Sequence, residues 1–186
     1  MVAVQTGAIA LETFLKLPNI DESPAWEYVN GAAYQKPMPK TRHSLLQKRL
    51  LSQIDRHSET QTALPELRCT FGGRSIAPDI SVIAWNRIPL NEAGEPEDNF
   101  NAAPDWAIEI LSPQQSTTRV LDNLLHCLKN RCQLGWMIDP AEYSILTLLP
   151  NQAPQVCRGE RPPIVLKGVN LSVTAQQVFD WLKVKR

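Results

Sequence analysis

The chain has 186 residues, of which 43% are hydrophobic and 20% charged, and its 19 basic residues balance its 19 acidic ones. This length fits one compact domain over residues 1–186, and the composition excludes disordered and fibrous classes. The formal net charge of zero excludes a global positive field that would attract nucleic acid, so a polyanion site would have to be a local patch.

Targeting and redox signals point to the cytoplasm. No segment approaches the roughly 18 uninterrupted apolar residues of a membrane span, and the start, MVAVQTGAIALETFL, lacks a secretory pattern. The cysteines form no CxxC pair, which favours buried thiols in a reducing compartment over a zinc site. We therefore expect a cytoplasmic protein with no membrane partner.

The first third of the chain predicts two helices with a hairpin between them. Apolar residues at helical spacing predict helices over residues 8–17 and 43–57. Between them, residues 25–36 (AWEYVNGAAYQK) carry Asn-Gly, the signal of a two-residue type I′ turn, and predict a β-hairpin.

The middle of the chain predicts a second hairpin and a buried strand. Residues 63–85 read as two strands around a Gly72-Gly73 turn. Residues 86–103, rich in Asn, Pro, Gly and Glu, predict a long loop. Residues 105–111 (DWAIEIL) are almost continuously apolar, which is typical of a strand buried on both faces.

The last third predicts two helices and several short strands. The helices are expected over residues 116–131, capped by Ser116 or Thr117, and over 174–182, capped by Thr174. The strands are expected at residues 134–139, 143–149, 155–157 and 163–168. The order of elements indicates an α/β (α+β) fold with a mixed sheet flanked by helices.

Two carboxylates lie in apolar runs that follow a Pro-Asp pair. Asp79 belongs to APDISVIAW, and Glu109 lies inside APDWAIEILSP. An unpaired buried charge is costly, so both need a partner. If the two strands are neighbours, both carboxylates lie within reach of one divalent cation, with the backbone carbonyl of Ile110 as a further ligand. Such an oxygen-only set suits Mg²⁺, or Mn²⁺.

A purely structural interpretation is also open. Glu109 could be a buried carboxylate paired with Arg68 or Arg74, and Asp79 could be a strand-entry residue after a proline. Asp105, in the second stretch, is interpreted as a strand-start residue.

The ordered series APDISV, PDWAIEILSP and LGWMIDP, preceded by WEYVNGAAYQKPMP and His43, resembles a known family. This is the large, cyanobacteria-rich family of restriction-endonuclease-like proteins within the PD-(D/E)xK nuclease superfamily. The resemblance covers essentially the whole chain. It implies a restriction-endonuclease-like core, Mg²⁺-dependent phosphodiester hydrolysis, a nucleic-acid substrate, DNA first, and a homodimer.

The resemblance also assigns site residues. Asp79 matches the Pro-Asp aspartate and Glu109 the second acid. Glu27 matches an acidic residue that the superfamily often places near the site, although it could be a surface hairpin glutamate. His43 lies where the family often has histidine, and we expect it to cap or pack rather than to bind metal.

The lysine of the family motif has no match. A strict E-x-K places it at Leu111, and relatives supply it from the next helix, at Asn123. Asparagine can donate a hydrogen bond but carries no charge. Arg119, one helical turn earlier, could substitute in part, or be a solvated arginine, whereas Lys129 lies on another face. We therefore predict three acids without their cation.

The sequence supports two alternative functions and also indicates a local basic surface. The first is a metal-dependent DNA endonuclease, and the alternative is a degenerate nuclease fold that binds nucleic acid or a protein without cutting. A basic surface could track a phosphate backbone, although a solvated helix face is the commoner explanation. Its residues are Lys36, Lys40, Arg42, Lys48 and Arg49.

Overall fold

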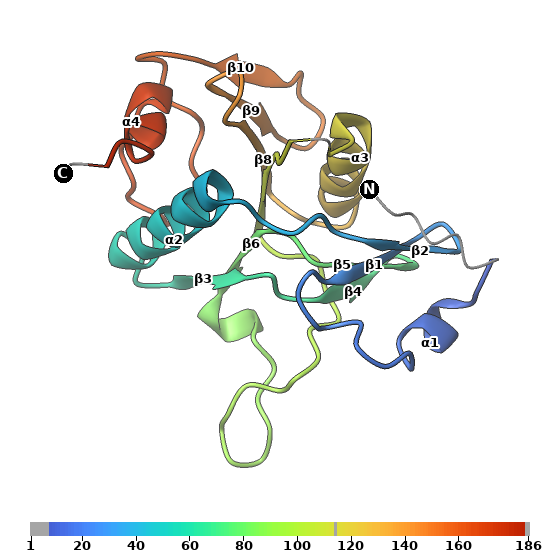
Figure 1. Ribbon diagram of the computed structural model, residues 1–186. Helices are drawn as coiled ribbons and strands as arrows, with labels where there is room; N and C mark the ends of the chain where they lie inside the picture. Colours follow the sequence, from blue (N-terminus) through green and yellow to red (C-terminus); the bar gives the residue numbers. More distant parts are fainter. Residues whose placement is uncertain (1–7, 114, 185–186) are drawn as a thin grey trace.

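The computed structural model describes residues 8–113 and 115–184 and contains two β-sheets (Figure 1). The four-stranded sheet has the order β2-β1-β5-β4, and the six-stranded sheet has the order β10-β9-β8-β7-β6-β3. The strands are β1 (Trp26–Val29), β2 (Ala32–Gln35), β3 (Gln61–Pro65), β4 (Cys69–Phe71), β5 (Arg74–Ile76), β6 (Ile80–Ala84), β7 (Trp106–Ile110), β8 (Leu134–Asp139), β9 (Ser144–Leu148) and β10 (Gln155–Cys157). The helices are α1 (Leu11–Phe14), α2 (Thr41–Arg56), the 3₁₀ helix η1 (Trp85–Arg87), α3 (Thr117–Lys129) and α4 (Ala175–Asp180).

The six-stranded sheet forms the middle layer of the molecule. Helices α2 and α4 cover one face, and α3 with the four-stranded sheet covers the other (Figure 1). The alternation of β7 explains this division, because Ile108 and Ile110 pack with α2, whereas Ala107 packs with α3. All five residues of β7 are buried, as the apolar run predicts. Glu109 shares its face with Ala107, on the side of α3.

The second predicted hairpin is confirmed, and it is bent across both sheets. β4 pairs with β5 around Gly72 and Gly73, and β3 pairs with β6 in the same continuous register. The tip therefore belongs to the small sheet and the base to the large one. Between the two halves only Glu66 N–H bonds across, to the carbonyl of Asp79. Glu66 has φ 49°, a left-handed conformation that turns the chain between sheets. Asp79 lies at this bend.

Most predicted elements form, with two differences. The first helix is limited to Leu11–Phe14. The strand expected at residues 163–168 does not form, because Pro162 and Pro163 have no N–H to donate to a ladder. That segment still packs on the core, where the Ile164 carbonyl accepts a bond of 2.7 Å from Trp136 Nε1. Residues 86–103 form the expected long loop apart from Asn86 and Arg87, which belong to η1.

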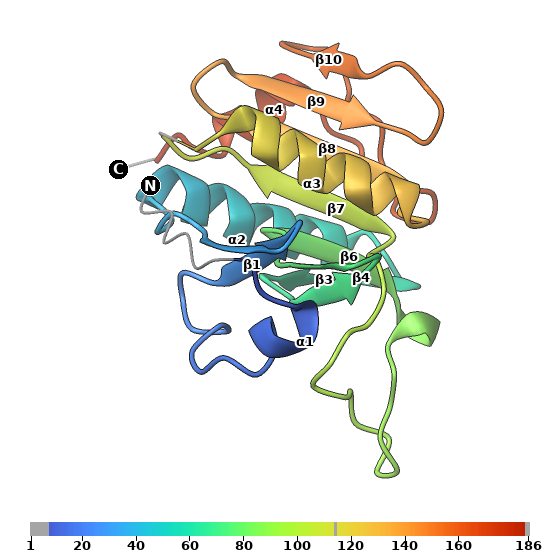
Figure 2. The same ribbon diagram turned by 90° about the vertical axis from the view of Figure 1, so that its right-hand side faces the viewer.

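The ends of three elements lie together at one end of the six-stranded sheet. The carboxyl end of β7 and the amino ends of α2 and α3 lie together (Figure 2). Ser116 accepts a bond from the N–H of Arg119 and so caps α3 as predicted, whereas α2 has no side-chain cap. Within the part of the chain that the structure describes, no helix is long and apolar enough to cross a membrane.

Candidate functional site

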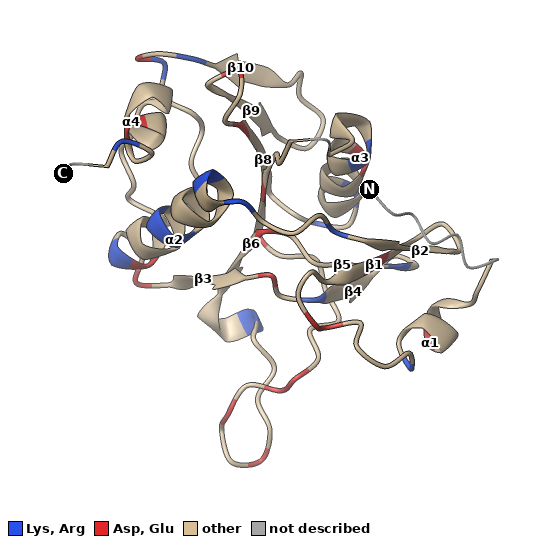
Figure 3. Ribbon diagram, in the orientation of Figure 1, with Lys and Arg blue, Asp and Glu red and all other residues tan. Residues whose placement is uncertain are grey.

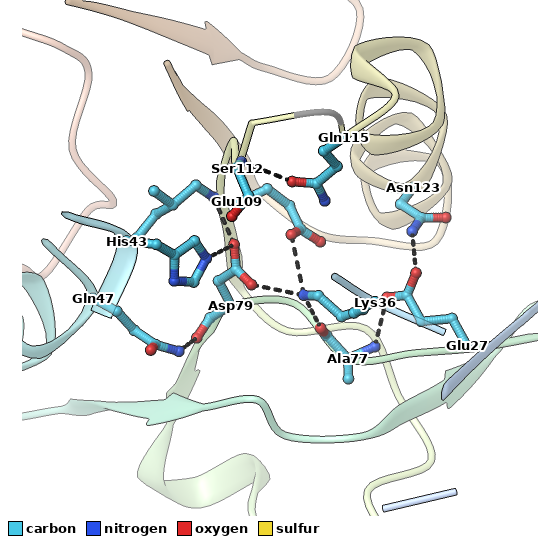
Figure 4. A network of polar contacts seen from close by, with 11 residues as sticks. Glu27, Lys36, His43, Gln47, Ala77, Asp79, Glu109, Ser112, Gln115 and Asn123 are labelled. Carbon is cyan, nitrogen blue, oxygen red and sulfur yellow. Dashed lines mark hydrogen bonds and ion pairs between the residues drawn. The ribbon is translucent and has the colours of Figure 1, made fainter. Parts of the chain in front are cut away.

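Four charged side chains meet at the bend of the long hairpin, and we call them the carboxylate cluster: Glu27, Lys36, Asp79 and Glu109 (Figure 4). Lys36 Nζ lies 2.7 Å from Asp79 Oδ1 and 3.4 Å from Glu109 Oε2. It also donates to the Ala77 carbonyl at 2.7 Å. The three acids are 2–5% exposed, so the cluster is almost completely removed from water.

The fold explains how these residues meet. β6 and β7 are antiparallel neighbours with Ile80 opposite Ile108, so Asp79 and Glu109 follow at the same end of the pair. Lys36 directly follows β2, and its N–H continues the ladder by bonding to the Ala25 carbonyl. The small sheet therefore supplies the ammonium, and the large sheet supplies two of the acids.

The bend leaves backbone groups without ladder partners, and side chains of the site satisfy them. Ala77 N–H donates to Glu27 Oε1 at 3.1 Å, while the Ala77 carbonyl accepts from Lys36. Gln47, on α2, donates to the Asp79 carbonyl at 2.7 Å. Because buried backbone groups are costly to leave unpaired, the same contacts stabilise the bend and fix the charged groups.

Asp79 is held from three sides. Its Oδ2 accepts from the N–H of Ile110 at 2.7 Å and lies 3.0 Å from His43 Nε2. His43 is therefore part of the site, whereas the sequence predicted only capping or packing. Its Nδ1 is buried and has no hydrogen-bond partner among the described residues.

Glu27 and Asn123 form a second polar pair beside the ammonium. Asn123 Nδ2 donates to Glu27 Oε2 at 3.0 Å. Asn123 is 3% exposed, and its Oδ1 has no hydrogen-bond partner among the described residues. Asn123 therefore orients Glu27 and leaves one buried oxygen available to a ligand.

Burial and neighbouring charges set the protonation of the cluster. Burial opposes charge on Lys36, but Asp79, Glu109 and Glu27 outweigh burial and raise the pKa of Lys36 above its ordinary range. Burial likewise opposes charge on Asp79, but Lys36 and His43 hold the pKa of Asp79 below its ordinary range. Burial, with the Asp79 and Glu27 charges, raises the pKa of Glu109 well above 4.5 despite Lys36. One ammonium thus stabilises one carboxylate and leaves Glu109 inclined to keep a proton.

Two small cavities flank Lys36. One, of about 30 Å³, is lined in part by Glu27, Glu109, Asn123 and Arg119, and the other, of about 10 Å³, by Asp79 and His43. The larger one is of a size that admits a water molecule or an ion. The Arg119 guanidinium lies 4.1 Å from the centre of the Tyr34 ring, at the first cavity. Arg119 therefore lies at the edge of the site rather than inside the cluster.

The donor set is compatible with a divalent ion. Carboxylate and amide oxygens are ligands that Mg²⁺ and Mn²⁺ take, and the 30 Å³ cavity offers both kinds, including the unpartnered Asn123 oxygen. In the described part of the chain, no three His, Cys, Asp or Glu side chains are grouped as a metal site by themselves. Between Asp79 and Glu109 the ammonium takes the central position, and Ile110 presents its N–H, not its carbonyl, to Asp79.

The structure corrects the expectation of acids without a cation. Lys36, which the sequence placed in a basic surface, provides the ammonium from a position 73 residues before Glu109. The alternative pairing with arginine is also wrong, because Arg68 binds Asp21 and Arg74 binds Asp122. Leu111 is partly buried after β7, and Lys129 is exposed at the end of α3. The four cysteines are buried and free, as expected.

The rest of the expected basic surface follows α2. Lys and Arg residues gather along this helix, whereas acidic residues follow the loop between η1 and β7 (Figure 3). Lys40, Arg42 and Lys48 are exposed, and Arg49 donates to the Trp181 carbonyl.

Comparisons with known proteins identify the fold and the family. No curated protein matches the chain. A crystal structure of a "putative nuclease belonging to DUF820" from Anabaena variabilis ATCC 29413 is 44% identical, covers 94% of this chain and 99% of its own, and superposes with a TM-score of 0.91. This similarity establishes the restriction-endonuclease-like fold. The family model Uma2, described as "Putative restriction endonuclease", matches residues 11–176, and the chain therefore belongs to that family.

Proposed function

We propose that the protein is a Mg²⁺-dependent (or Mn²⁺-dependent) endonuclease that hydrolyses phosphodiester bonds in DNA. One observation carries this proposal: Lys36 Nζ contacts both Asp79 and Glu109, at 2.7 and 3.4 Å, inside a buried cluster. Two acids and a lysine are the functional set of the PD-(D/E)xK superfamily that the sequence resembles. Here the residue that directly follows β2 supplies the lysine. Membership in a restriction-endonuclease family supports nuclease chemistry in general.

Each member of the cluster has a chemical role in this proposal. Asp79 and Glu109 would hold the ion, and Glu27 and Asn123 would add oxygen atoms beside them. A bound divalent ion supplies Lewis-acid stabilisation of phosphate charge and an activated water. Lys36 compensates negative charge on the phosphate and orients the attacking water. His43 and Gln47 position Asp79 by contacting its side chain and its carbonyl.

The ammonium between the acids also removes the main support for a non-cutting fold. That alternative rests on the neutral Asn123 where relatives have lysine and on the net charge of zero, and we propose that Lys36 restores the missing charge. We further propose that the enzyme acts in the cytoplasm, where its buried free thiols would stay reduced. A homodimer would suit a duplex with two strands to cut, and sedimentation of the protein with and without DNA would detect it.

Cleavage of covalently closed circular DNA tests the proposal, since only an endonuclease can open a circle. We expect the wild type to nick or linearise circles with Mg²⁺ or Mn²⁺ and not with EDTA. Asp79→Asn and Lys36→Met should lower the rate at least about 100-fold, by analogy with the loss of one charge-stabilising group.

Lys129→Met is the matched control, because it makes the same chemical change at an exposed position at the end of α3. It should retain the wild-type rate. Equal cleavage by the wild type and Asp79→Asn would contradict the proposal, as would the absence of cleavage of circular, linear duplex and single-stranded DNA with both ions.

A further inference from the structure

A groove much larger than the two small cavities opens beside the carboxylate cluster. It lies between the start of α2, the segment after β7 and the turn after β8, and its volume is about 410 Å³. Binding sites for small molecules have volumes of this order. Its lining residues belong to the end of the sheet where α2 and α3 begin, and Figure 2 shows these element ends.

The groove is continuous with the candidate active site. His43, Ser112 and Gln115 line both the groove and the cavity of about 10 Å³ that Asp79 and Lys36 also line. His43 contacts Asp79 directly at 3.0 Å. A chain-like ligand that lies in the groove would therefore extend straight to the cluster.

The lining of the groove favours an anion. Lys40 and Arg42 contribute two positive charges, whereas Asp139 is the one acidic side chain among the described lining residues. Asp139 Oδ1 is engaged, because it accepts from the N–H groups of Ala141 and Glu142. Thr41 and Thr117 add exposed hydroxyl groups. The uncapped first turn of α2 adds positive potential on the same side.

Arg42 is already held in place across the groove. Its Nη2 donates to the Pro140 carbonyl at 2.7 Å, and its guanidinium lies 5.7 Å from the centre of the Tyr143 ring. A guanidinium has five N–H donors, so these contacts leave donors for a phosphate. An arginine fixed before binding loses less conformational entropy when it binds.

The absence of stacking surfaces indicates which part of a nucleic acid fits. Among the described residues that line the groove, none is Phe, Tyr or Trp. Bases bound without pairing are held by stacking on aromatic rings, whereas phosphates are held by cations, hydroxyls and backbone N–H groups.

We propose that this groove binds the sugar–phosphate backbone of the nucleic-acid strand that crosses the carboxylate cluster. Lys40 and Arg42 contact phosphates next to the one that is cut, and binding here does not depend on base sequence. This inference rests on the proposed function and extends it by defining where the substrate strand lies.

Binding without cleavage tests the groove. Fluorescence anisotropy of labelled oligonucleotides in EDTA, over a series of salt concentrations, would compare the wild type with Lys40→Gln/Arg42→Gln. We expect the double variant to bind at least about fivefold more weakly. Its slope of log affinity against log salt should fall by about 1 for each lost phosphate contact. Two oligonucleotides of unrelated sequence should show the same loss.

Lys16→Gln/Lys129→Gln is the matched control, since it removes the same charge from exposed positions that lie outside both the groove and α2. Its affinity should stay close to that of the wild type. An equal loss of affinity in both double variants, or no loss in either, would contradict the proposed role of the groove. Thermal unfolding checks that Arg42→Gln leaves the fold intact, and Lys40→Gln alone, at an exposed residue, gives a second test in which about half of the effect is expected.

The outcomes separate this inference from the proposed function. If the wild type cuts circles and the groove variant binds like the control, the groove proposal fails and the nuclease stands. If the wild type neither binds nor cuts nucleic acid, both fail.

Discussion

The two Pro-Asp stretches of this chain place the same residue type in two different surroundings. Asp79 and Asp105 each follow a proline, precede an antiparallel strand of the same pair and are 2% and 5% exposed. Because β6 and β7 run in opposite directions, the two aspartates lie at opposite ends of that pair. Burial and local sequence therefore do not distinguish them.

Their partners do. Asp105 binds Arg87 at 2.6 Å, and its carboxylate also accepts from Ala84 N–H at 2.8 Å and from Gln133 at 3.0 Å. It has one cation to itself and lines neither the small cavities nor the groove. Asp79 shares its ammonium with Glu109 and adjoins a cavity. The two aspartates therefore differ in competition for a cation and in the space beside them, and on these two features we propose Asp79 as the functional acid.

Exchange of each aspartate for asparagine should give the largest contrast. Asp79→Asn should lower DNA cleavage by about 10³-fold, because it removes a charge from the reacting centre. Asp105→Asn should change the rate per folded molecule by less than about twofold. Initial rates with Mn²⁺, normalised to the folded fraction, measure this contrast, and similar losses in both variants would break the distinction.

The free energy of unfolding should depend more on Asp105 than on Asp79. Asp105→Asn replaces the charged acceptor shared by Arg87 and the part-buried Ala84 N–H with a neutral amide, which should lower the free energy of unfolding by about 2 kcal/mol. Asp79→Asn should cost less, because Glu109 can then ionise and pair with Lys36. Urea unfolding at neutral pH compares the two, and a larger loss in Asp79→Asn would contradict this order.

Lys36 and a bound metal ion would compete for the same two carboxylates. Replacement of Lys36 should therefore change cleavage and metal binding in opposite directions. Lys36→Met should lower cleavage and yet bind Mn²⁺ about tenfold more tightly, a gain of about 1.4 kcal/mol. The reason is that no ammonium then contacts the two carboxylates. Calorimetry with Mn²⁺ at pH 8 measures the change, with Lys48→Met as the control that should match the wild type. Weaker binding by Lys36→Met would show that the ammonium does not compete with the ion.

The smallest expected effect concerns pH and the second acid. Because the pKa of Glu109 is raised above 4.5, the folded protein binds that proton more tightly than the unfolded chain. Its contribution to stability is thus complete below pH 4.5 and is lost as pH rises through the raised pKa. The pKa of Asp79 is lowered, so its contribution is lost only below pH 3.8.

Glu109→Gln should therefore remove part of the decline in unfolding free energy above pH 4.5. Chemical denaturation between pH 5 and pH 9 measures it, with the exposed Glu160→Gln as control. Parallel curves for Glu109→Gln and the wild type would show that Glu109 titrates normally.

The acids were predictable from sequence, and the ammonium was not. Asp79 and Glu109 interrupt apolar strands, and a charge in such a place needs an explanation. Lys36 gives no such signal, since it lies beside prolines in QKPMPK and is separated from its partners by 43 and 73 residues. Its position becomes informative only when the small sheet packs on the large one.

Local sequence patterns also predicted most of the helices and strands. The Gly72-Gly73 hairpin was predictable in its pairing, but its bend was not, because it depends on Glu66 and on the contact between sheets. The strand expected at residues 163–168 failed for a local reason, since two prolines prevent pairing even though Leu166 is buried. His43 was assigned to packing because no sequence pattern showed that α2 begins beside Asp79.

The division of the site between two sheets has a consequence for chains that are partly folded or truncated. The first hairpin carries Glu27 and precedes Lys36, whereas Asp79 and Glu109 come from segments synthesised later. Neither part has the full set of charges alone. A partly folded or truncated chain would hold acids without their lysine, or the lysine without its acids. Under the proposed function, cleavage would therefore begin only after the two sheets have packed together.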